Sequence, residues 1–248
     1  MRFRTIIALA GLAITLSSCG REMLREYEYE EEIFLDVDGS ATVVVNASIP
    51  ALVALRGLDV NPDPHARFDR RRLETAYASP VTRVRRISQP WYRDGRRFVQ
   101  VRLDVPDVRR LGEAAPFAWS TYRFDATATE LVYHQIVGAA AAVGVDRTGW
   151  TGGELVAVRI HLPSRIHYHN VRRLEDGAPG QVQRGNILVW EQRLTDRLKG
   201  VPLDVEARIE PQSILSATLQ IYGIATIAAL VVVVGLIVWT LRGRRQEN

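Results

Sequence analysis

The chain has 248 residues, of which 47% are hydrophobic and 24% are charged, an ordinary composition for a protein with a folded core. Its formal charge of +4 comes from the two ends, because residues 1–18 and residues 242–248 contribute +2 each and leave the remainder neutral. A nucleic-acid-binding domain needs a basic face of its own, so we predict no nucleic-acid partner, and a single cysteine excludes a disulfide framework.

Residues 1–18 have the organisation of a bacterial signal peptide. Two arginines precede an apolar run that ends at Leu16, and the run is too short to span a bilayer, which takes about 20 residues. The quartet Leu16-Ser17-Ser18-Cys19 resembles the lipobox of bacterial lipoproteins. This resemblance implies cleavage before Cys19 and acylation, with palmitate among the expected acyl groups. An uncleaved anchor that ends in an unmodified cysteine is the alternative.

Residues 19–211 are expected to form one extracytoplasmic α+β domain. Alternating residues predict a strand over 26–37, and Asp38-Gly39 predicts a type I′ hairpin turn into a second strand over 42–49. Pro50 favours the start of a short helix over 51–58.

The rest of the domain reads as strands with a few short helices. An amphipathic helix is expected over 65–78, and its Arg67 and Arg70 to Arg72 either touch anionic headgroups or form a solvated face. A second short helix is expected over 106–113, and a long loop over 138–153. The predicted strands are 81–88, 97–105 (entered through an Asp94-Gly95 turn), 119–126, 130–137, 155–162, 186–192 and 203–209. Because no βαβ regularity appears, we expect a mainly antiparallel sheet with two or three helices packed on it.

Residues 214–241 carry no charge and are long enough for a single C-terminal transmembrane helix. Tyr222 and Trp239 lie where interfacial aromatic residues are common. Arg242, Arg244 and Arg245 follow in the basic tail 242–248. The positive-inside rule therefore predicts a single-pass protein of a bacterial cytoplasmic membrane, with the domain outside and the tail in the cytoplasm. A buried core helix is the alternative.

Three histidines form the one cluster that suggests chemistry. His167 and His169 point to the same side of an extended segment, and His161 lies shortly before them. With Glu175 or Asp176 they could complete a zinc site. Solvent-facing histidines at a sheet edge are the alternative. Nucleophile motifs and phosphate loops are missing from the sequence, so we expect a protein that is not an enzyme and carries no cofactor.

The chain as a whole resembles the LppM-type bacterial lipoproteins. The resemblance depends on the segment from Leu16 to Cys19, the hairpin Ile33 to Val43, and the segments Val158 to Ser164 and Asn186 to Trp190. It implies an α+β ectodomain beside a C-terminal membrane helix, and envelope glycolipid binding rather than catalysis. It carries over no site residue.

These observations predict a non-enzymatic, membrane-anchored envelope lipoprotein whose outer domain binds a lipid, a glycolipid or a membrane protein partner. A structural subunit of a membrane protein complex is the first alternative. A metal-dependent hydrolase that uses His161, His167 and His169 is the second.

Overall fold

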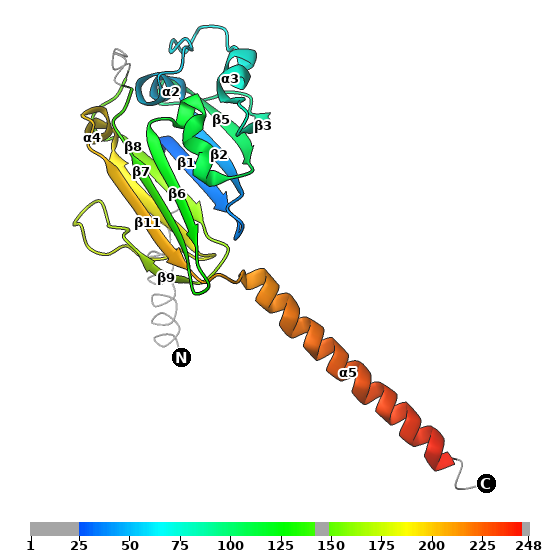
Figure 1. The fold of residues 1–248 in the computed structure, drawn as a ribbon. Helices are drawn as coiled ribbons and strands as arrows, with labels where there is room; N and C mark the ends of the chain where they lie inside the picture. Colours follow the sequence, from blue (N-terminus) through cyan, green and yellow to red (C-terminus); the bar gives the residue numbers. More distant parts are fainter. Residues whose placement is uncertain (1–24, 142–148, 245–248) are drawn as a thin grey trace, which may run out of the picture.

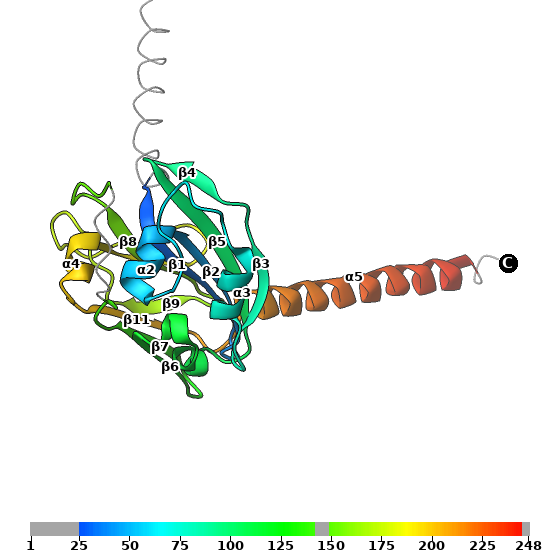
Figure 2. The same ribbon diagram turned by 90° about the horizontal axis from the view of Figure 1, so that it is seen from above.

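The computed structural model describes residues 25–141 and 149–244, without the side chains of 215–218, 220, 221 and 236–244. Two β-sheets face one another, with short helices at one end (Figures 1 and 2). The seven-stranded sheet has the order β10-β8-β1-β2-β5-β3, with β4 paired to β5, and the four-stranded sheet has the order β6-β7-β11-β9. The strands are β1 (Tyr27–Leu35), β2 (Ala41–Ser48), β3 (Arg83–Ile87), β4 (Trp91–Arg93), β5 (Arg96–Val105), β6 (Ser120–Ala126), β7 (Leu131–Val137), β8 (Leu155–His161), β9 (Ile166–His169), β10 (Ile187–Arg193) and β11 (Leu203–Ile209).

Alternation along β1 places one row of side chains in the core and the other on the outer face of the seven-stranded sheet. Tyr29, Glu31, Ile33 and Leu35 are all buried, because they face the four-stranded sheet. β1 pairs with β2 in antiparallel fashion and with β8 in parallel fashion. The other pairings among the described strands are antiparallel.

The two Asp-Gly turns differ from each other. Asp94 and Gly95 both have positive φ angles, 47° and 70°, as a type I′ turn requires. At the first hairpin only Gly39 has a positive φ, 87°. The Asp36 N–H donates to the Ser40 carbonyl at 2.9 Å, and the Gly39 N–H donates to the Asp36 carbonyl at 3.1 Å. The predicted type I′ turn at Asp38-Gly39 is therefore wrong. The loop is one residue longer and ends in a left-handed glycine, which avoids the cost of a left-handed Asp38.

Apart from the C-terminal helix, the helices are short and mostly lie at one end of the sheets. α2 (Ile49–Arg56) begins at a Ser48 cap and is almost wholly buried. α3 (Arg70–Tyr77) begins at an Asp69 cap, so the predicted helix over 65–78 is too long at its start. The 3₁₀-helices η2 (Val108–Glu113) and η3 (Ala115–Phe117) follow β5. α4 (Leu194–Leu198) was not predicted.

The structure corrects the predicted fold class in two respects. The protein is a mixed α+β protein made mostly of strands, but it has two packed sheets where one was expected. α5 (Ile214–Arg244) is helical and extends away from the domain (Figure 1). Within the described residues, no helix combines the length and the apolar character that crossing a membrane requires. The predicted transmembrane helix over 214–241 and the single-pass location in a cytoplasmic membrane are therefore wrong.

The predicted lipobox and the last four residues of the basic tail, 245–248, lie outside the part of the chain that the structure describes. Leu16, Ser17, Ser18 and Cys19, like Arg245, lie outside the described residues. Tyr222 is on α5 and is 68% exposed. The backbone of α5 also includes Trp239, Arg242 and Arg244, whose side chains are not described.

Candidate functional site

The three histidines proposed as metal ligands lie on two different sheets. His161, on β8, contacts Glu32 at 2.7 Å and stacks on Phe34 with ring centroids 4.0 Å apart. His167 and His169 are on β9 of the four-stranded sheet. Within the described part of the chain, no group of three or more His, Cys, Asp or Glu residues is placed to hold a metal ion. The described geometry therefore gives the metal-dependent hydrolase no site.

A buried polar network around Glu31 lies within the apolar core between the two sheets. Its carboxylate accepts hydrogen bonds from the Tyr122 hydroxyl at 2.9 Å and from Gln135 Nε2 at 3.0 Å, both on the facing sheet. It also accepts bonds from Arg56 Nη2 and the Tyr29 hydroxyl, each at 3.1 Å. Burial raises the pKa of the Tyr122 hydroxyl well above its ordinary value. The phenol therefore remains a donor, and the network joins the two sheets.

A small cavity beside this network limits what the core can hold. Its volume is about 20 Å³, and Arg56 and Arg197 line it together with apolar side chains that include Leu55 and Leu203. A buried water needs roughly 10–15 Å³ of such space, so this cavity holds about one water molecule. Burial, and then the nearby Arg56, lower the pKa of Arg197 to about 10. An acyl chain does not fit here.

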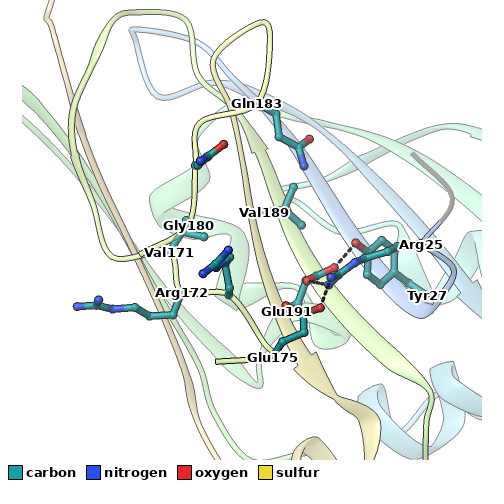
Figure 3. A pocket seen from close by; sticks show the side chains of 11 residues that line it. Arg25, Tyr27, Val171, Arg172, Glu175, Gly180, Gln183, Val189 and Glu191 are labelled. Atoms are coloured by element: carbon teal, nitrogen blue, oxygen red, sulfur yellow. Dashed lines mark hydrogen bonds and ion pairs between the residues drawn. The ribbon is translucent and has the colours of Figure 1, made fainter. Parts of the chain in front are cut away.

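A larger pocket lies on the outer face of the seven-stranded sheet, at its β10 edge. Its volume is about 160 Å³. Tyr27 and Glu191 reach it from β1 and β10, and the segment 171–183, which follows β9, forms the opposite wall (Figure 3). We call it the Arg25–Glu191 pocket. Its lining residues are Arg25, Tyr27, Val171, Arg172, Arg173, Glu175, Gly180, Gln181, Gln183, Val189 and Glu191.

Arg25 and Glu191 form the centre of this pocket. The Arg25 guanidinium bridges the carboxylates of Glu191 and Glu175 (Figure 3). The Tyr27 hydroxyl donates to Glu191 Oε1 at 2.5 Å. Burial and this hydrogen bond raise the pKa of the Tyr27 hydroxyl far above its ordinary value. The Glu191 side chain is only 12% exposed, so its partners hold it in a fixed position.

The outer wall of the pocket depends on a close approach at Gly180. Gly180 N–H donates to the Val171 carbonyl at 2.9 Å, which closes the segment 171–180 on itself. A Cβ added at Gly180 would lie 2.4 Å from Val171 Cγ1. Only glycine fits there without a shift of the wall.

The chemistry of the pocket favours binding through hydrogen bonds. Three guanidiniums supply donors, two carboxylates supply acceptors, and Gln181 and Gln183 supply both. The opposite charges nearly balance, and Val189 gives a small apolar floor. Sequence patterns did not indicate this site, because Arg25 and Glu191 are 166 residues apart and carry no motif. Strand alternation alone would place Tyr27 on the same face as Tyr29, but the pairing of β1 with β8 is irregular between these two residues, and Tyr27 lies in the pocket on the outer face.

Comparisons with known proteins add little about function. No protein-family profile matches the chain, and no curated protein sequence is significantly similar to it. Among solved structures, the chain is similar to the folded domain of the Mycobacterium tuberculosis LppM protein, determined by NMR. The two share 13% sequence identity over 75% of this chain and 92% of that chain, with a TM-score of 0.37. The LppM-type resemblance thus extends to a distant likeness of fold at most.

Proposed function

We propose that this chain is a non-enzymatic binding module that holds the polar headgroup of an envelope glycolipid in the Arg25–Glu191 pocket. The observation that carries the proposal is the mixed lining of this pocket, in which donors and acceptors surround about 160 Å³ and Arg25, Tyr27 and Glu191 hold one another in place. Sugar hydroxyls both donate and accept, so a lining of nearly balanced charge suits a neutral polyol better than a simple anion.

The volumes of the Arg25–Glu191 pocket and of the cavity between the sheets suit the headgroup and the acyl tail of a glycolipid differently. Typical small-molecule sites measure roughly 300–1,000 Å³, so the Arg25–Glu191 pocket fits one ring-sized polar group. The cavity between the sheets, at about 20 Å³, has no room for the lipid tail. The tail would therefore stay in the membrane while the headgroup enters the pocket.

Acylation at Cys19 would place the pocket near such headgroups. Arg25 follows Cys19 by six residues, and an extended chain spans at most about 3.3–3.6 Å per residue. The pocket would then lie within about 20 Å of a lipid attached to Cys19. A single acyl chain gives only a reversible hold on a membrane, and a bound glycolipid would supply a second one.

Vesicle binding tests the proposal. The full chain is mixed with phosphatidylcholine vesicles that carry a minority of diglucosyl diacylglycerol, and bound protein is measured by flotation. Glu191→Gln removes the carboxylate that Arg25 and Tyr27 orient, so we expect weaker binding by about tenfold, as for a lost charge-assisted hydrogen bond.

Glu113→Gln is the matched control, because Glu113 is an exposed carboxylate paired with Arg110 and does not line the pocket. It should bind like the unchanged chain, and the glycolipid should be recovered intact by mass spectrometry. Equal binding by both variants, or no preference for glycolipid over plain vesicles, would contradict the proposal. Hydrolysed glycolipid would contradict its non-enzymatic part.

A further inference from the structure

A second cavity lies where α2, the connection from α2 to α3, and β5 meet. Its volume is about 190 Å³. Three arginines line it, Arg67, Arg72 and Arg97, and Asp69 is the only acidic residue among its lining. The remaining wall is mainly apolar and is formed by Ile49, Val60, Phe68 and Leu73, with Asn61 beside them. We call it the Arg97 cavity.

Arg97 is a buried cation without an acidic partner. It lies on β5 and is 5% exposed. Its Nη2 donates to the carbonyl oxygens of Pro64 and Ala66, the latter at 2.5 Å. No carboxylate pairs with it within the described ranges 25–141 and 149–244. Buried charges in proteins are ordinarily paired, so the carbonyl bonds orient this guanidinium but leave its charge without a counterion.

The other two arginines lie on the more open side of the cavity. Arg67 is exposed, and the described residues provide no ion-pair partner for it. Arg72 pairs with Asp59, but the two side chains are 53% and 90% exposed, and such surface pairs are weak. The Asp69 carboxylate is engaged in capping α3, because it accepts a bond from the Arg72 N–H at 3.1 Å. The lining therefore carries three positive charges against one negative charge.

We propose that the Arg97 cavity is a phosphate-binding site. The planar guanidinium fork matches phosphate oxygens in two-point contacts, which explains the frequent use of arginine for phosphate recognition. The apolar side chains of the lining, Val60 and Phe68 among them, suit a phosphate that is attached to an organic group. Such a group is either an anionic lipid headgroup or a free phosphate ester. The site shares no lining residue with the Arg25–Glu191 pocket, so it stands apart from the function proposed above.

Two binding experiments on the full chain test this site. Inorganic phosphate is titrated by calorimetry at low salt. Sedimentation then measures binding to phosphatidylcholine vesicles with and without phosphatidic acid. Arg67→Gln and Arg72→Gln should each weaken phosphate binding by about fivefold or more, because each removes one charged donor. Asp59→Asn should strengthen it, because the Asp59 carboxylate competes for Arg72.

Arg71→Gln is the matched control. Arg71 is an exposed arginine of the same helix and does not line the cavity, so its loss should leave phosphate binding unchanged. Preference for phosphatidic acid vesicles over free phosphate would support the lipid source, and the reverse preference would support a free ester, provided that the cavity variants weaken the binding. No binding in either experiment would overturn the proposal. Binding that falls equally in Arg71→Gln and Arg72→Gln would also overturn it.

Discussion

Replacing Tyr122 by phenylalanine should lower the free energy of unfolding by about 1.5–3 kcal/mol, the usual range for a hydrogen bond to a charged group. Tyr122 is 6% exposed, and its hydroxyl donates to Glu31 Oε1 at 2.9 Å across the two sheets. The substitution leaves the ring in place and removes only the donor. The Glu31 carboxylate is itself fully buried, so water does not replace the lost bond at low cost.

Urea unfolding of the full chain, followed by tryptophan fluorescence, measures this change as a lower midpoint at an unchanged slope. Tyr92→Phe is the matched control, because Tyr92 is 62% exposed and its hydroxyl donates to the Pro64 carbonyl at 3.0 Å. It should change the free energy of unfolding by less than about 0.5 kcal/mol. An equally small loss in Tyr122→Phe would refute the idea that the Glu31 network joins the sheets.

Two further predictions concern the pocket wall and the edge strand β9. Gly180→Ala should lower the free energy of unfolding by about 1–3 kcal/mol, because the new Cβ overlaps Val171. Gly153→Ala should be tolerated, because its new Cβ would meet nothing closer than 3.8 Å. Equal urea midpoints for Gly180→Ala and Gly153→Ala would contradict the predicted overlap at Gly180. Burial lowers the pKa of His169, so its stabilising contribution is present above the ordinary histidine pKa of about 6.5 and is lost as the pH falls through that value toward the lowered one. The loss of unfolding free energy between about pH 7.5 and pH 5 should therefore be smaller in His169→Gln than in the unchanged chain. The exposed His65→Gln should keep the full difference; identical pH profiles for both variants would contradict the prediction.

Local patterns predicted most strands because alternation and turn residues act over short distances. The β6–β7 hairpin and the strands β8, β10 and β11 lie within a few residues of their predicted bounds. Patterns of this kind do not tell one sheet from two, since that depends on which strands pair. Glu31 is an example, because a carboxylate is not expected in a core, whereas here Arg56, Tyr122 and Gln135 satisfy it between the two sheets.

The Arg25–Glu191 pocket could not be predicted from the sequence, because residues that are distant along the chain form it. The ion pair between Arg25 and Glu191 joins the two ends of the domain. The histidines show the opposite case, because proximity in sequence suggested a cluster. The crossing from β8 to β9 takes the chain from one sheet to the other, and thus separates His161 from His167 and His169.

The most direct test of the glycolipid-binding account is an NMR titration of the full chain with methyl glucoside, the soluble part of such a headgroup. The account predicts that amide shifts concentrate at Tyr27, Gly180, Gln183, Val189 and Glu191, which line one pocket. Shifts that are absent at saturating sugar, or that are scattered over surfaces away from β10, would contradict it.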